Sequence, residues 1–146
     1  MQARKYGNKV VYADGHKFDS KAEEKYYQQL KWLKQAKQIK SFKLQPRYLL
    51  QEGFKKHGKT FRKIEYVADF EITNLDGSIE VIDVKGVETE AFKIKRKLFE
   101  KLYPYNLSLV TFEENLGKWM DLEELKKLKV KPRKKARARR VGKPKT

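Results

Sequence analysis

Two runs of alternating apolar and polar residues, joined by a short turn, most constrain how this chain can fold. The first run covers residues 61–72 and the second covers residues 79–85. A period of two predicts β-strands in which successive side chains point to opposite faces. We therefore expect an antiparallel pair in which Asp69 and Asp83 lie within about one residue of facing each other. On the second strand, Asp83 shares its face with Lys85.

The residues before this pair predict a small hairpin followed by a helix. Asp14 and Gly15 suit a tight two-residue turn between short apolar stretches. Ser20 and Glu23 then match a capping box, in which each side chain satisfies a free backbone amide at the start of a helix. Helical periodicity places Glu23 toward the buried side and Glu24 toward solvent. The residues expected in the core around this helix are Ala22, Tyr26, Tyr27, Leu30, Trp32 and Leu33, together with Trp119 from later in the chain.

The rest of the chain predicts a mixture of strands and helices. Residues 42–50 read as a strand in which Pro46 argues for an edge position, and residues 52–59 as a charged loop. A basic helix is expected from about residue 89 to residue 103, then a strand over residues 107–112 and a short helix over residues 121–129. The inward positions expected on the basic helix are Ala91, Ile94, Leu98 and Leu102. The predicted order is hairpin, helix, three strands, helix, strand, helix, which is an α/β fold with a mixed central β-sheet flanked by helices.

Charge indicates the kind of partner. The 146 residues suffice for one domain with a single core, and they carry 36 Lys and Arg against 19 Asp and Glu, a formal charge of +17. Nine of the basic residues lie in residues 131–146, where no acid occurs, and the other 27 still outnumber the acids by eight. Such a surplus favours binding to nucleic-acid phosphates. We expect one domain over residues 1–130 and a basic, disordered DNA-binding tail over residues 131–146.

Several classes of protein are excluded by what the sequence lacks. It contains no cysteine, so neither disulfides nor thiolate metal sites are available, which is typical of a reducing cytoplasm. No apolar run approaches the roughly 20 residues that span a bilayer, and we expect no membrane partner. The two histidines fall in turn-like stretches, and His57 is interpreted as a loop residue rather than a ligand.

Glu23, Asp69, Asp83 and Lys85 form the one group whose chemistry asks for an explanation. Two carboxylates a few ångströms apart either share a proton or bind a cation, and their hard oxygen atoms suit Mg²⁺. Lys85 would place an ammonium group beside that metal, and Glu23 would complete the site. Simpler interpretations exist: Glu23 as a capping residue only, Asp69 as a solvated strand residue, and Asp83 with Lys85 as an ion pair. The residues by themselves leave both interpretations open.

Basic side chains on the second helix and in the tail are candidate contacts to DNA phosphates. A solvated helix face is the simpler interpretation of those on the helix, and phosphate contact is slightly favoured because the whole chain is basic. The candidates are Lys93, Arg96 and Lys97 on the helix and Arg133, Lys134, Lys135, Arg137, Arg139 and Arg140 in the tail.

Three blocks of the sequence resemble the signature of the PD-(D/E)XK nuclease superfamily, in its order and spacing. They are Ser20-Lys21-Ala22-Glu23, Val67-Ala68-Asp69-Phe70 and Ile82-Asp83-Val84-Lys85-Gly86. Within the superfamily, residues 18–112 are most similar to phage-type Holliday junction resolvases of the endonuclease I kind and to small phage nucleases. Ala68 departs from the pattern by replacing the proline of the name, at a position that binds no metal.

The resemblance implies a restriction-endonuclease-like core and a metal-dependent, structure-specific endonuclease that cuts branched DNA. Glu23, Asp69 and Asp83 would be the catalytic acids and, with the carbonyl of Val84, the metal ligands, while Lys85 would be the catalytic lysine. Mg²⁺, or Mn²⁺ in its place, would polarise the phosphate and activate water. The resemblance also implies a homodimer in the cytoplasm of a bacterium or a phage-infected cell.

Other functions are compatible with the same residues. Restriction-like, transposon end-cutting and repair nucleases use the same metal site. From a different class, a non-catalytic protein that binds nucleic acid through its basic surface would show the same charge. Cleavage of DNA in the presence of Mg²⁺ separates these two classes.

Overall fold

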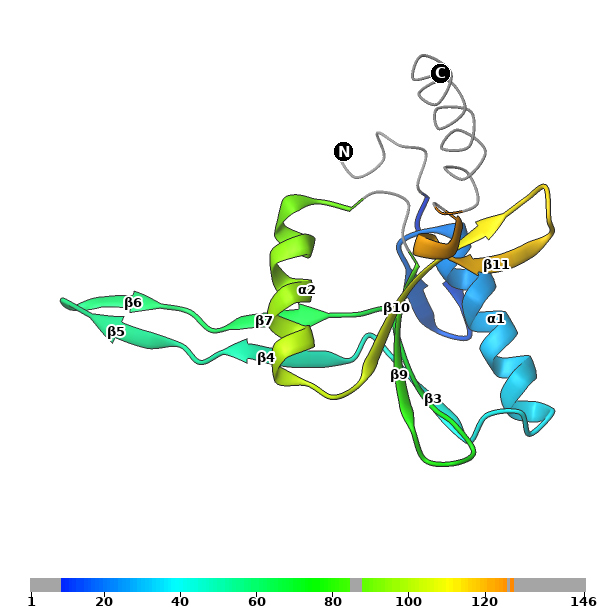
Figure 1. Ribbon diagram of the computed structural model, residues 1–146, viewed down its shortest axis with the longest axis horizontal. Helices are drawn as coiled ribbons and strands as arrows, with labels where there is room; N and C mark the ends of the chain where they lie inside the picture. The colour runs from blue at the N-terminus through cyan, green and yellow to red at the C-terminus, as the bar shows by residue number, and fades with distance from the viewer. Residues whose placement is uncertain (1–8, 85–87, 126, 128–146) are drawn as a thin grey trace, which may run out of the picture.

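The computed structural model describes residues 9–84, 88–125 and 127, and its centre is a mixed five-stranded β-sheet (Figure 1). Across the sheet, the strands are β11 (Lys118–Asp121), β10 (Asn106–Glu113), β9 (Ile79–Val84), β8 (Phe70–Thr73) and β3 (Ser41–Leu44). β9 and β10 run parallel, and the other neighbouring strands run antiparallel. The predicted α/β class with a mixed sheet is confirmed, and β11 is a strand that the sequence did not predict.

Two helices, α1 (Lys21–Gln35) and α2 (Glu90–Leu102), pack against the strands of the described part of the chain, and each has its own hydrophobic cluster. α1 contributes Tyr26, Tyr27 and Leu30 to one cluster, and α2 contributes Phe92 and Phe99 to the other. Both helices begin at predicted positions, since the hydroxyls of Ser20 and Thr89 each accept a hydrogen bond from the amide three residues later, at 3.1 Å. α2 connects the parallel strands β9 and β10 as a crossover helix.

The predicted N-terminal hairpin is present and packs on α1. β1 (Val11–Ala13) and β2 (His16–Phe18) are antiparallel, and the turn residues Asp14 and Gly15 have φ angles of 50° and 81°. Positive φ at both central residues is the geometry that Asp-Gly favours in a two-residue hairpin turn. Phe18 is buried with its ring centroid 5.0 Å from that of Tyr27, which ties the hairpin to the helix.

The two long strands predicted over residues 42–50 and 61–72 are each broken in the middle. β4 (Arg47–Gln51) and β7 (Ile64–Val67) pair with each other in a separate two-stranded sheet. Figure 1 shows this ribbon leaving the central sheet near β9 and β10. The first break follows from Pro46, which lacks an amide donor, and from Gln45, whose φ of 49° is left-handed. The break in the second predicted strand falls at Ala68 and Asp69, between β7 and β8.

Backbone hydrogen bonds hold the two breaks side by side. The Gln45 amide donates to the Asp69 carbonyl at 2.9 Å, and the Ala68 amide donates to the Pro46 carbonyl at 3.1 Å. Both strands therefore bend at the same level, and the bend carries Asp69.

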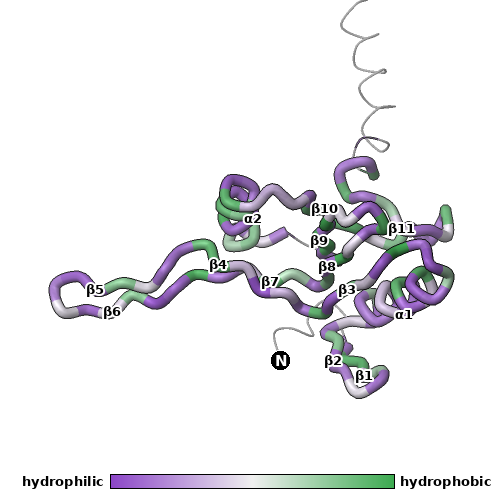
Figure 2. The backbone as a smooth tube through the Cα atoms, turned by 90° about the horizontal axis from the view of Figure 1, so that it is seen from below, coloured by the Kyte–Doolittle hydropathy of each residue, from purple (hydrophilic) through white to green (hydrophobic). Residues whose placement is uncertain are grey.

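The prediction of a charged loop over residues 52–59 is wrong. The stretch contains β5 (Phe54–Lys56) and leads into β6 (Lys59–Phe61), and the two strands form an antiparallel hairpin at the far end of the β4–β7 ribbon (Figure 2). His57 and Gly58 form its turn, with φ angles of 51° and 74°. The predicted element order is corrected accordingly, since six strands, β3 to β8, stand where the sequence predicts two.

The inward face predicted for α2 is wrong at three of its four positions, since Ala91, Ile94 and Leu102 are exposed and only Leu98 packs against the hydrophobic cluster. Ile94 and Leu102 are 58% and 52% exposed, while Phe92 and Phe99 are buried against Tyr48 and Tyr66 of the ribbon. The ribbon offers aromatic rings on the side of α2 that carries its phenylalanines, and this contact decided the orientation of the helix. Trp32 was likewise expected in the core and is exposed, whereas Trp119 packs partly buried against Tyr26.

The C-terminal elements are described in part. Residues 122–125 are helical, and the Asp121 carboxylate accepts a hydrogen bond from the Glu123 amide at 2.8 Å, as expected for a cap. The end of the predicted helix and the whole basic tail lie outside the described residues. Among the described residues, neither helix is long and apolar enough to cross a membrane.

Candidate active site

Asp69 and Asp83 meet across β8 and β9 at the bend of the ribbon. Phe70 pairs with Ile82, so the next position along the same register places Asp69 opposite Asp83. The Asp69 amide donates to Asp83 Oδ1 at 3.0 Å, and the amide of Val84 donates to Asp69 Oδ2 at 2.8 Å. The predicted juxtaposition of the two acids is therefore confirmed.

Asp83 is buried, and Tyr66 is the partner that the sequence did not reveal. Asp83 is only 2% exposed, and its Oδ2 accepts a hydrogen bond from the Tyr66 hydroxyl. In a continuous strand over residues 61–72, Tyr66 and Asp69 are an odd number of positions apart, so their side chains would point to opposite faces. The break at Ala68 and Asp69 changes that relation, because the two residues no longer belong to one continuous strand. Tyrosine hydroxyls need a partner when buried, and this was the signal available in the sequence.

Glu23 lies in the first turn of α1, and its charge reaches Asp69. It is half-buried, its amide donates to the Ser20 hydroxyl, and its charge acts on Asp69. Glu24 instead accepts a hydrogen bond from Gln28 Nε2 at the helix surface, at 2.7 Å. Both acids are half-buried, so the predicted asymmetry appears in their partners and not in their burial.

The electrostatics of the cluster oppose the ionised form of Asp69. Burial, followed by the charges of Asp83 and Glu23, raises the pKa of Asp69 from 3.8 to about 8, against the lowering effect of the Val84 amide. Burial and the Asp83 charge also raise the pKa of the Tyr66 hydroxyl. Acids placed so close together gain free energy from a proton or from a cation.

The carboxylate oxygens of this site suit a hard cation, although they do not form a complete coordination shell. Among the described residues, no group of three His, Cys, Asp or Glu side chains is positioned to hold a metal ion. Mg²⁺ commonly takes only one or two carboxylates and fills its other positions with water and substrate phosphate. Asp69 and Asp83, with the backbone of Val84 at the end of β9, fit that smaller requirement.

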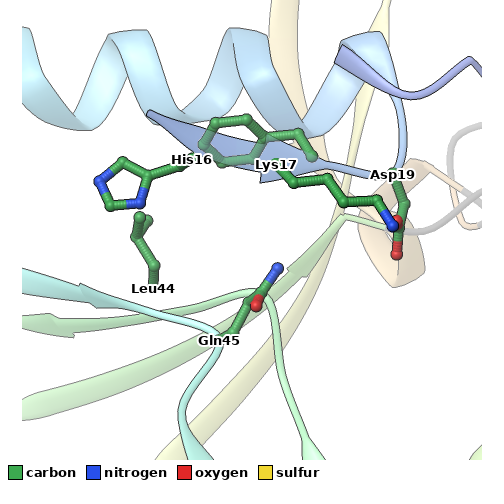
Figure 3. A pocket seen from close by; sticks show the side chains of 6 residues that line it. His16, Lys17, Asp19, Leu44 and Gln45 are labelled. Atoms are coloured by element: carbon green, nitrogen blue, oxygen red, sulfur yellow. The ribbon is translucent and has the colours of Figure 1, made fainter. Parts of the chain in front are cut away.

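A pocket adjoins the bend on the side of the first hairpin (Figure 3). It has a volume of about 320 Å³ and is lined by His16, Lys17, Phe18, Asp19, Leu44 and Gln45. Its side chains come from β2, from the residue preceding the α1 cap and from the β3–β4 break. The backbone amide of Gln45 donates a hydrogen bond to the backbone carbonyl of Asp69. This pocket is therefore next to the acid pair Asp69 and Asp83.

The other predicted site residues are placed as follows. Lys85 lies outside the described residues, as do all six tail candidates, Arg133, Lys134, Lys135, Arg137, Arg139 and Arg140. On α2, Lys97 is exposed and Lys93 is half-exposed beside Glu90, at 3.6 Å. Arg96 lies between two carboxylates, 3.7 Å from Glu100 and 3.6 Å from Glu123. These ion pairs partly neutralise the Arg96 guanidinium. Lys97 is therefore the better candidate for a contact with a DNA phosphate.

Comparison with known families adds one finding. Residues 3–120 match the family model described as "Protein of unknown function (DUF1064)". The chain belongs to the DUF1064 family. The match covers the acid cluster, the β4–β7 ribbon and both helices, and it ends before the basic tail. No curated protein and no solved structure gave a significant match to this DUF1064 chain.

Proposed function

We propose that this DUF1064 protein is a Mg²⁺-dependent DNA endonuclease with a restriction-endonuclease-like core. The observation that carries the proposal is the meeting of Asp69 and Asp83 across β8 and β9, and the charge of Glu23 in α1 also acts on Asp69. One helix acid and two strand acids are the donor set that the PD-(D/E)XK resemblance implies. Among the described residues, the charges that act on Asp69 are those of Asp83 and Glu23, and a bound cation would compensate them.

Each residue of the site would have its own role in the reaction. Asp69 and Asp83, with the carbonyl of Val84, would hold Mg²⁺, and Glu23 would hold water near it. Bound Mg²⁺ polarises a phosphate and lowers the pKa of bound water, and Mn²⁺ supplies the same chemistry. Tyr66 fixes the orientation of the Asp83 carboxylate. Lys85 follows β9 by one residue in sequence, and we assign it the stabilisation of charge on the attacked phosphate.

Branched DNA, and a Holliday junction in particular, is the substrate that we propose. The charge of +17 favours a DNA partner, and Lys93, Arg96, Lys97 and the tail supply candidate phosphate contacts. A homodimer would present two such sites to the two strands of a four-way junction. The cytoplasm of a bacterium or a phage-infected cell is the compartment that fits this substrate.

The decisive experiment is a cleavage assay on four-way junction, fork, duplex and single-stranded DNA, with and without Mg²⁺. We expect nicked products that require Mg²⁺ and that Asp83→Ala abolishes. Glu24→Ala is the matched control, because Glu24 is the neighbour of Glu23 with a hydrogen bond to Gln28 outside the cluster. Absence of cleavage on all four substrates with Mg²⁺ or Mn²⁺ would reject the proposal. Cleavage of plain duplex in preference to the junction would instead favour a restriction-like or repair nuclease.

A non-catalytic DNA- or RNA-binding protein is the second candidate, and one observation favours it. Both carboxylate oxygens of Asp83 already accept hydrogen bonds, from Tyr66 and from the Asp69 amide. In that case the acids would serve only to fix the bend of the ribbon. Tight binding to nucleic acid without cleavage, unchanged in Asp69→Asn, would support this function.

A further inference from the structure

The β5–β6 hairpin lies far from the central sheet (Figures 1 and 2), and it carries an exposed pair of stacked aromatic rings. Phe54 and Phe61 are cross-strand partners whose ring centroids lie 4.8 Å apart with an interplanar angle of 13°. They are 46% and 37% exposed, and they lie outside both hydrophobic clusters of the body. The pair stabilises the hairpin across its strands, but it leaves apolar surface in water at the end of the ribbon.

The same hairpin is strongly basic. Residues 52–63 contain five Lys and Arg and one acid, Glu52. Lys56 and Lys59 are directly opposite each other next to the turn, and like charges in such a pair destabilise a hairpin. Lys59 Nζ lies 5.5 Å from the centroid of the Phe61 ring, on the same face. A polyanion bound at the tip would relieve the repulsion between the two lysines.

The space beside the rings is open enough to take a flat group. A hollow of about 540 Å³ is lined by Gly53, Phe54, Phe61, Arg62 and their neighbours. Phosphate contacts from Lys and Arg together with stacking on aromatic rings are the recurring means of holding unpaired or exposed bases. In continuous duplex the faces of the bases are already stacked on each other, and only their edges are exposed in the grooves. Stacking of a base pair on phenyl rings is therefore most favourable where the face of that base pair is exposed, as at a branch or an end.

We propose that the β5–β6 hairpin binds DNA at the branch point, with Phe54 and Phe61 against an exposed base-pair face and Lys56 and Lys59 on the flanking phosphates. The inference deepens the proposed function, because it assigns the choice of branched DNA to a named element. Phe61 and Asp69 are eight positions apart, which is at most about 26 Å of extended chain. At 3.4 Å per base pair, the cut phosphate lies within about eight nucleotides of the branch.

The test compares binding to a fluorescently labelled synthetic four-way junction with binding to a linear duplex of the same arm sequences. Binding is measured by anisotropy in EDTA, so that no cleavage occurs and the result does not depend on the metal site. The variant is Phe54→Leu with Phe61→Leu, which keeps apolar side chains in the hairpin and removes the rings. The matched control is Tyr12→Leu with Trp32→Leu, two aromatic residues that are 71% and 63% exposed elsewhere on the molecule.

We expect the wild-type protein and the control to bind the junction more tightly than the duplex. In the hairpin variant, the ratio of duplex Kd to junction Kd should be about tenfold smaller, with the duplex Kd unchanged. Lys56→Ala with Lys59→Ala should weaken binding to both DNAs and reduce the dependence on salt. The inference is overturned if the wild type binds both DNAs equally or if the hairpin variant keeps the preference. It is also overturned if sedimentation shows that the variant loses a dimer together with junction binding, because the hairpin would then dock on a second copy. Hairpin-dependent junction binding by a protein that cuts no DNA would reject the nuclease and retain this inference.

Discussion

The Tyr66 hydroxyl donates a hydrogen bond to the buried carboxylate of Asp83, from a strand of the ribbon to a strand of the central sheet. Tyr66 belongs to the hydrophobic cluster under α2, where its ring lies 5.5 Å from that of Phe99. The contact therefore joins the packed core to the acid pair. It fixes the direction of Asp83 before any substrate or metal arrives.

Tyr66→Phe is expected to lower DNA cleavage by roughly tenfold or more, because a group that orients a metal ligand commonly contributes that much. The ring and its packing remain, so the protein should fold. Tyr48→Phe is the control: the Tyr48 hydroxyl donates to Glu71 at 2.6 Å in the same cluster, away from Asp83. Each variant should lose about 1 to 3 kcal/mol of unfolding free energy in urea. Equal cleavage by both variants would contradict the role assigned to Tyr66.

Asp69→Asn is expected to stabilise the metal-free protein at alkaline pH. The pKa of Asp69 is raised from 3.8 to about 8 in the folded state, so between these values the folded chain holds a proton that the unfolded chain has lost. The stability contributed by this group falls as the pH rises from about 4 to about 8 and then levels off. Above pH 8, Asp69→Asn should unfold at least about 3 °C higher than the wild type.

The measurement is the difference in melting temperature between wild type and Asp69→Asn from pH 4 to pH 9, in EDTA. Taking the difference cancels the effect of the general positive charge. Adding Mg²⁺ should raise the melting temperature of the wild type and leave that of Asp69→Asn unchanged. Glu24→Gln, at the helix surface, should follow the wild type at every pH. Parallel curves for wild type and Asp69→Asn would rule out the raised pKa.

Phe99→Ala is expected to cost about 3 to 5 kcal/mol of unfolding free energy, because Phe99 is fully buried and its removal leaves a cavity. Leu102→Ala, three residues later on the same helix and 52% exposed, should cost less than about 1 kcal/mol. Urea unfolding of the two variants measures the difference. The reverse order would mean that α2 turns Leu102 inward and Phe99 outward, which would agree with the prediction from the sequence.

Deletion of residues 131–146 is expected to weaken DNA binding and to flatten its dependence on salt. The segment carries nine basic residues, and each phosphate contact contributes about 0.9 to the slope of log affinity against log salt concentration. Cleavage at low salt should persist, because the acid cluster lies elsewhere in the chain. A salt slope identical to that of the full chain would show that the tail does not contact DNA.

Local chemistry made much of the candidate site predictable. The Asp14-Gly15 turn, the cap at Ser20 and the register that places Asp69 opposite Asp83 all follow from residues that interact within a few positions or across one short turn. Their energetics depend on backbone angles and on neighbouring hydrogen bonds, which the sequence specifies directly. The asymmetry between Glu23 and Glu24 follows from helical periodicity in the same way.

The sequence by itself determined the α/β class, the first hairpin, the start of each helix and the pairing of the two strand acids. Only the tertiary structure decided that the long strands break at Gln45 and Asp69, that α2 turns Phe92 and Phe99 inward, and that Tyr66 reaches Asp83. Strand alternation says which side chains share a face, but it does not say where a strand leaves its sheet. That choice depends on packing between segments far apart in the chain, where the buried aromatic area of the ribbon outweighs the local preference for a continuous strand.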